Sequence, residues 1–297
     1  MVMAANQAIR AARLVYVHGT GPQPARADLK RRLDEALFGS EQGDRTALAY
    51  YADVLHPNGV AETLRVLAEI LPSLPAHLRR EPAPLIAELV READPNRPEA
   101  RAAATRVATM LGARIVRAPT AQAEADSPVA ALLPRALRAL LFRLILRFLM
   151  RDADAYFFEG SAGPIRQRVR DVLDASDTPV VVIGHSLGSI VAYDILSDPP
   201  GPPRDVPLFL TLGSPLGIDA VKELVHQPPA IPPGVAAWLN ASDPVDIVAA
   251  DPQLRDDYGG SDQIRDLTVF NPAWFPHDLA GYLRAPAVRD AVSAALR

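Results

Sequence analysis

Residues 180–188 read Val-Val-Val-Ile-Gly-His-Ser-Leu-Gly. Four β-branched residues in succession, without alternating polar side chains, are typical of a parallel strand that is buried on both faces. The glycines that follow favour a tight turn, and the apolar spacing over residues 189–196 predicts a helix. The sequence therefore predicts a strand, a turn and a helix, with Ser186 at the turn.

Other parts of the chain repeat this alternation of strands and helices. Helical spacing is present over residues 24–38, 164–175 and 286–296. Short apolar runs predict further strands at residues 14–17, 46–51, 207–212, 235–239 and 264–270. Strands that alternate with helices are typical of an α/β domain with a mostly parallel sheet, which is the fold class that we predict.

The middle of the chain has a different pattern. Between residues 60 and 150 no segment has the pattern of a strand, and prolines interrupt several helical segments. We therefore expect residues 60–150 to form a helical cap inserted into one domain. Residues 1–59 and 151–297 are expected to form the core of that domain.

The composition excludes several classes of function. Of the 297 residues, 49% are hydrophobic and 22% are charged, and the formal net charge is −4. Such a chain has no basic field that would bind nucleic acid. The absence of cysteine excludes disulfides, a thiol nucleophile and thiolate metal sites. No metal-binding motif is present, so we expect neither a metal nor a cofactor.

The sequence also bears on location. Residues 1–13 are rich in alanine but lack the continuous apolar core of a secretory signal. No run of 18 or more uncharged apolar residues is present, which argues against a membrane-spanning helix. We therefore expect a cytoplasmic protein.

The turn at Ser186 has the pattern G-x-S-x-G, from Gly184 to Gly188. Between a strand and a helix, this pattern places the serine on a strained turn, so that its hydroxyl projects above the sheet. The backbone N–H of Leu187, at the start of the helix, would then point toward a reacting oxygen. The alternative is an ordinary glycine-rich turn without catalytic function.

Residues 180–195 resemble the nucleophile elbow of α/β-hydrolases, especially of lipases and esterases that carry G-H-S-L-G. The resemblance implies a mostly parallel sheet of about eight strands, flanked by helices and often covered by a helical cap. It also implies a catalytic triad in the chain order serine, acid, histidine. The activity implied is that of a serine hydrolase, which cleaves carboxylic esters through an acyl-enzyme on Ser186.

The order of the triad directs attention to the C-terminal part of the chain. His277 is the last of six histidines and lies in a loop rich in proline and aromatic residues, after the strand predicted at 264–270. It is the candidate base, and the alternative is a surface histidine without a catalytic role. For the acid we favour Asp243, because residues 240–245 resemble the N-x-x-D-P-V segment that carries the acid in lipase-like members. Asp246 is the alternative.

A second loop can supply the oxyanion hole. Residues 18–22 read His-Gly-Thr-Gly-Pro and follow the first predicted strand. They resemble the H-G-x-G oxyanion loop of the family. We expect Thr20, or next Gly21, to donate a backbone N–H together with Leu187, and His18 to brace the loop. A phosphate-binding loop is disfavoured, because no G-x-G-x-x-G pattern follows and prolines interrupt the amides.

An apolar helix with five arginines is predicted over residues 135–151. Three of the arginines are spaced four residues apart and form one narrow stripe. The helix can be a buried cap helix, at a subunit contact if the protein is oligomeric, or an interfacial helix that rests on an anionic membrane surface. In either case it would wall an apolar pocket, which favours an ester substrate with a lipophilic acyl or alcohol part.

Two other functions remain open. A thioesterase or an amidase would use the same triad. The chain could also be a non-catalytic binding or sensing module with an α/β-hydrolase-like fold.

Overall fold

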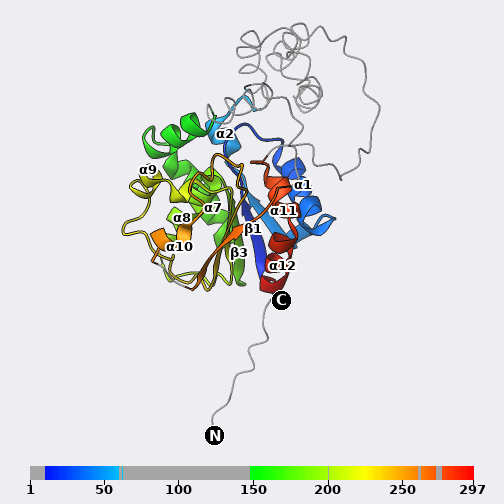
Figure 1. The fold of residues 1–297 in the computed structure, drawn as a ribbon. Helices are drawn as coiled ribbons and strands as arrows, with labels where there is room; N and C mark the ends of the chain where they lie inside the picture. Colours follow the sequence, from blue (N-terminus) through cyan, green and yellow to red (C-terminus); the bar gives the residue numbers. More distant parts are fainter. Residues whose placement is uncertain (1–10, 60–61, 63–147, 200, 260–261, 272–275) are drawn as a thin grey trace, which may run out of the picture. The chain divides into compact units, whose positions relative to one another are not determined.

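The computed structural model describes residues 11–59, 62, 148–199, 201–259, 262–271 and 276–297. These residues form a single sheet of six parallel strands in the order β2-β1-β3-β4-β5-β6, with helices on both sides (Figure 1). The predicted α/β class and parallel sheet are confirmed. The described residues supply six strands rather than about eight.

The elements follow the predicted alternation. In chain order they are β1 (Arg13–Val17), α1 (Arg26–Phe38), η1 (Gly43–Arg45), β2 (Thr46–Ala49), α2 (Ala52–Leu55), α7 (Ala162–Asp174), β3 (Val180–His185), α8 (Leu187–Ser197), β4 (Phe209–Leu212), η5 (Pro215–Gly217), α9 (Asp219–Lys222), β5 (Trp238–Ser242), α10 (Leu254–Asp257), β6 (Ile264–Thr268), α11 (Leu279–Arg284) and α12 (Pro286–Ala295). Residues 148–157 are also helical.

One strand begins and ends later than predicted. The sequence predicts a strand over residues 235–239, whereas β5 runs from Trp238 to Ser242. The Asn240 side chain in this strand is buried but has hydrogen-bond partners. Its amide donates to the carbonyl oxygen of Pro252 and to Asp266. Because this polar side chain has partners in neighbouring segments, the strand continues beyond the apolar run.

The centre of the sheet is buried on both faces. Every residue of β3 and β4 is buried, as are Leu14–Val17 of β1. The helices around the sheet belong to two groups. Arg166 of α7 forms an ion pair with Asp194 of α8, and Arg289 of α12 donates to the carbonyl of Leu37 in α1. Figure 1 shows these two helix pairs on opposite sides of the sheet.

The strand order changes direction at β1. The chain passes from β1 to β2 on one side, and β3 then pairs with the other side of β1. In open parallel sheets, ligands bind beyond the carboxyl ends of the strands at such a reversal. The register places Val17 of β1 beside Gly184 of β3. The loop that begins at His18 and the turn at Ser186 therefore emerge side by side at this point.

Contacts divide the chain into two compact units. The first unit comprises Met1–Gly19, Lys30–Tyr50 and Ile165–Arg297, and the second comprises Thr20–Leu29 and Tyr51–Pro164. Apart from residues 62 and 148–150, the insertion predicted at 60–150 lies outside the described residues, as do residues 135–147 of the predicted arginine-striped helix. No helix within the described ranges has the length and apolar character needed to cross a membrane.

Candidate active site

Ser186 occupies a strained turn between β3 and α8. Its backbone angles are φ 52° and ψ −128°, and it is the one residue other than glycine with a positive φ in the described part of the chain. L side chains rarely adopt this conformation, and strain of this kind is typical of functional sites. The sequence-based prediction of a strained strand-to-helix turn at Ser186 is confirmed.

Glycines make this turn sterically possible. A Cβ at Gly184 would lie 2.7 Å from the Cα of Ser189, and one at Gly188 would overlap the backbone carbonyls of Val17 and His18. At Gly19, a Cβ would lie 2.8 Å from the Cβ of Ser186. The flanking glycines of G-x-S-x-G are therefore required by close packing between β1, β3 and the start of α8.

Ser189 and Ser214 hold the turn at Ser186 through hydrogen bonds. The hydroxyl of Ser189 donates to the carbonyl of Ser186, and it also lies 2.7 Å from the hydroxyl of Ser214. Because the single proton of Ser189 is already donated, Ser214 must be the donor in the second bond. Ser214 in turn accepts the N–H of Leu216. This chain of hydrogen bonds ties the strained turn to the loop after β4.

His277 forms a close buried pair with Asp246. The distance from His277 Nδ1 to Asp246 Oδ2 is 2.8 Å, and the two residues are 7% and 4% exposed. The other oxygen of Asp246 accepts the N–H of Val248 at 2.9 Å. Since the carboxylate can only accept, Nδ1 of His277 donates the proton of this bond, and Nε2 is the ring nitrogen left for another partner.

Asp246, rather than Asp243, is the partner of His277, so the predicted choice between the two carboxylates is wrong. The Asp243 side chain instead accepts hydrogen bonds from backbone N–H groups of nearby loops. Its Oδ1 accepts the N–H of Val245 at 2.9 Å and its Oδ2 accepts the N–H of Asn271 at 2.6 Å. An Asp that caps backbone amides in a turn is common, and the sequence alone does not distinguish it from an acid that points toward a histidine.

The surroundings of Asp246 keep it ionised. Burial alone would raise the pKa of Asp246, but the hydrogen bond and charge of His277 and the hydrogen bond from Tyr282 lower it further than burial raises it. The hydroxyl of Tyr282 donates to Asp246 Oδ2 at 2.7 Å and accepts the N–H of Asp243 at 2.9 Å. Tyr282, on α11, thus helps to hold the Asp246 carboxylate in place.

A glycine after β4 leaves room for the pair. Gly213 has φ +52°, and a Cβ there would lie 2.6 Å from Asp246 Oδ2 and 3.0 Å from His277 Nδ1. The segment after β4 therefore borders the His277–Asp246 pair. The backbone N–H of Ser186 donates to Leu212, directly before Gly213. The serine turn and the His277–Asp246 pair therefore meet at the end of β4.

Ser186 Oγ and His277 Nε2 share an unusual property. Both atoms are buried, and neither has a hydrogen-bond partner among the described residues. Buried polar atoms without a partner are uncommon in folded proteins and often mark functional groups. A nucleophile and a base whose hydrogen bond forms only when a substrate is bound would account for both atoms.

His185 is a residue whose role the sequence did not indicate. Its ring centroid lies 4.6 Å from that of His277, and its Nε2 lies 3.1 Å from the backbone carbonyl of His277. Burial, and then the charge of His277, hold the pKa of His185 well below its ordinary value. His185 is therefore neutral, and because the carbonyl can only accept, its proton is on Nε2.

The predicted oxyanion donors have different surroundings. Leu187 is the first residue of α8, where a helix leaves its N–H groups without an intrahelical acceptor. The N–H of Gly21, by contrast, donates to Asp152 Oδ2 at 2.7 Å. The sequence predicts Gly21 as an oxyanion donor, but its N–H is already used in this bond. Thr20 stays a prediction, and His18 Nδ1 lies 2.8 Å from the carbonyl oxygen of Gly19, in keeping with a bracing role.

Asp152 belongs to a buried charged group in the second unit. His56 Nδ1 lies 2.9 Å from Glu62, and His56 Nε2 lies 2.9 Å from Asp152. Arg151 also donates to Glu62 at 3.0 Å. Burial would lower the pKa of His56, but hydrogen bonds and charges from Asp152 and Glu62 raise it above its ordinary value. We call His56, Glu62, Arg151 and Asp152 the His56 network.

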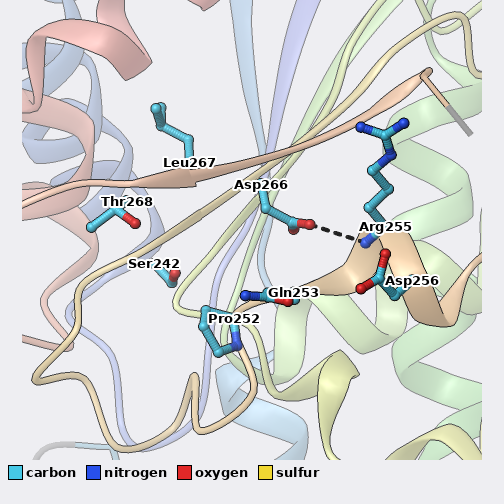
Figure 2. Close-up of a pocket in the computed structure, with 8 residues that line it drawn as sticks. All are labelled: Ser242, Pro252, Gln253, Arg255, Asp256, Asp266, Leu267 and Thr268. Carbon is cyan, nitrogen blue, oxygen red and sulfur yellow. Dashed lines mark hydrogen bonds between the residues drawn. The ribbon is translucent and has the colours of Figure 1, made fainter. Parts of the chain in front are cut away.

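A cavity of about 290 Å³ lies elsewhere, between β5, β6 and α10 (Figure 2). Its lining contains none of Ser186, Asp246 and His277. Asp266 provides the most conspicuous carboxylate there, yet its oxygens accept the backbone N–H groups of Leu254 and Arg255 at 3.0 Å each. Asp266 therefore caps α10 rather than facing a ligand as a free carboxylate.

Comparison with known proteins adds no assignment. No protein-family model matches the chain, and no curated protein matches it in sequence.

Proposed function

We propose that the protein is a serine hydrolase with an α/β-hydrolase fold, and that it cleaves carboxylic esters through an acyl-enzyme on Ser186. The observation that carries this proposal is the buried His277–Asp246 pair at the sheet end where Ser186 sits in a strained turn. Ser186 Oγ and His277 Nε2 are both buried without a partner. A nucleophile, a base and an acid that orients the base are the groups that acyl transfer requires.

The proposed roles follow from the geometry of the His277–Asp246 pair. His277 Nε2 takes the proton of Ser186 as its hydroxyl oxygen attacks the ester carbonyl carbon. The resulting imidazolium is stabilised by the ionised Asp246, and it then protonates the leaving alcohol. Water attacks the acyl-enzyme by the same route, and Ser186 is restored. The N–H of Leu187, at the start of α8, supports the oxyanion, with Thr20 as the proposed second donor.

Apolar side chains near this site support a lipophilic substrate. Val245 and Ile247 flank Asp246 on its loop and are 65% and 42% exposed, and Phe270, next to Asn271, is 80% exposed. Exposed apolar groups around a catalytic loop favour contact with hydrocarbon. This contact favours an ester with a long acyl or alcohol part over a short one.

A substrate panel tests this function. The purified protein is assayed against p-nitrophenyl esters of increasing acyl length and against matched thioesters and anilides. We expect hydrolysis of the esters, faster for medium and long chains than for acetate. Ser186→Ala should lower kcat roughly 10⁶-fold.

The outcomes separate the alternatives. Faster turnover of thioesters or anilides would keep the mechanism and change the substrate class. Hydrolysis that survives Ser186→Ala would contradict the proposal, and so would a folded protein that hydrolyses none of the three classes. The exposed Ser293→Ala variant, in α12, is the matched control and should keep full activity.

A further inference from the structure

The backbone around His277 is held by side chains from two other segments. The side-chain amide of Asn271 donates to the carbonyls of Pro276 at 3.0 Å and Asp278 at 2.9 Å. The Nε2–H of His185 donates to the carbonyl of His277 between them, at 3.1 Å. Three consecutive carbonyl groups are therefore each held by a side-chain donor.

Asn271 is itself anchored. Its backbone N–H donates to Asp243 Oδ2 at 2.6 Å, and the other oxygen of Asp243 accepts from Val245. Asp243 follows β5 and Asn271 follows β6, so this bond ties the ends of two neighbouring strands together. Asp243 and Asn271 are 5% and 8% exposed. In such a buried setting, an unpaired partner is costly, which makes the arrangement rigid.

We propose that His185 and Asn271, with Asp243 as the anchor of Asn271, are positioning residues that fix the place of the His277 imidazole. We call these three residues the base clamp. The inference rests on the proposed function, because a precise position matters only if His277 acts as a base toward Ser186.

The clamp supplies a constraint that Asp246 does not. The Asp246 carboxylate fixes Nδ1 of the His277 ring, but a single bond to one ring atom leaves the backbone free to shift. An error of about 1 Å in the position of a catalytic group can lower the rate about 100-fold. His185 is suited to this role because it is neutral: it donates to the carbonyl of His277 and does not compete for the serine proton.

Paired substitutions at His185 test the clamp. His185→Phe keeps a flat ring against His277 but removes the donor, whereas His185→Gln can place an amide N–H near the original Nε2. We expect His185→Phe to lower kcat roughly 10- to 100-fold with little change in KM. His185→Gln should recover most of that loss. His226 is exposed, and His226→Phe is the matched control that should behave as wild type.

Asn271→Ala provides a second test from the other side of the loop. It removes the donor to two carbonyls and should also lower kcat. The exposed Gln263→Ala variant is its control. Near-UV circular dichroism of each variant establishes that it is folded. If Asn271→Ala does not fold, the His185 pair still decides the question.

A readout that does not depend on turnover separates this inference from the proposed function. The Nδ1–H of His277, hydrogen-bonded to Asp246, should give a downfield proton resonance that is missing in His277→Gln. We expect wild type and His185→Gln to keep this signal and folded His185→Phe to lose or broaden it. If His185→Phe and folded Asn271→Ala keep both the signal and the wild-type kcat, the clamp is refuted. If the wild type hydrolyses nothing, the proposed function fails and the resonance alone decides the clamp.

Discussion

Two aspartates three residues apart in one loop have different partners. Asp246 accepts from the His277 ring and the Tyr282 hydroxyl, whereas Asp243 accepts from the backbone N–H groups of Val245 and Asn271. The side chain is the same at both positions, so the difference arises from where each one points. At the level of single residues, Asp246 is therefore the proposed catalytic acid, and Asp243 supports the loop that carries His277, the proposed base.

This division predicts unequal effects of the same substitution. Asp246→Asn replaces the acceptor for the His277 Nδ1–H with an amide and favours the wrong imidazole tautomer, so kcat should fall roughly 10⁴-fold. Asp243→Asn keeps its size and one acceptor oxygen, and among the described residues Asp243 touches only backbone N–H groups, those of Val245 and Asn271, and not the His277 ring. We expect its loss in kcat to be no more than about 100-fold. Steady-state kinetics with the best ester of the panel measures both.

The opposite ranking would contradict this assignment. If Asp243→Asn abolished turnover while Asp246→Asn kept most of it, Asp243 would be the acid, as the sequence resemblance alone suggested. Circular dichroism at equal protein concentration excludes unfolding as the cause in either variant.

At the scale of elements, the His56 network joins segments that are distant in sequence. His56 follows α2, Glu62 lies six residues further on, and Arg151 and Asp152 lie in the helix that contains residues 148–157. Asp152 also accepts the N–H of Gly21. The His56 imidazolium lies between two carboxylates and is almost excluded from water, since His56 is 1% exposed. Removing one member of such a group leaves buried charge without compensation.

We therefore expect His56→Gln to lower the free energy of unfolding by ~3 kcal/mol near pH 6. Because the pKa of His56 is raised in the folded state, the folded protein holds a proton that the unfolded chain releases above about pH 6.5. The stabilisation is thus complete below that pH and is lost as pH rises through the raised pKa. Urea unfolding of both proteins across this range measures the difference.

The test compares how the unfolding free energy of wild type and of His56→Gln changes with pH. The difference in unfolding free energy should shrink as pH rises through the His56 pKa. A difference that is constant with pH would show that His56 contributes by packing alone. The exposed His226→Gln variant serves as the control, and its stability should follow the wild type at every pH.

At the scale of the whole molecule, the parallel sheet explains why residues far apart in sequence meet. All six strands run in the same direction, so the segments after β1, β3, β4, β5 and β6 leave the sheet at one edge. Ser186 follows β3, Asp246 lies after β5, and His277 lies after β6. The reversal of strand order at β1 places this edge where such sheets bind ligands.

Much of this arrangement could be predicted from the sequence. The β-branched run of residues 180–183 and the glycines around Ser186 report strictly local geometry, so the strand, turn and helix were predicted correctly. His277 was proposed as the base from its position after the last predicted strand, and that role stays a prediction. The choice between Asp243 and Asp246 was wrong because it depends on side-chain direction in a loop. The contacts of His185, Asn271 and Tyr282 depend on packing between distant segments, which no local pattern encodes.

Covalent labelling with a fluorophosphonate, located by mass spectrometry of the digested protein, directly tests whether Ser186 is an activated nucleophile. We expect one adduct, on the peptide that contains Ser186. No adduct should form in Ser186→Ala, and labelling should be much slower in His277→Gln, which removes the base. A folded wild-type protein that does not react, or an adduct on another residue that persists in Ser186→Ala, would contradict this proposal.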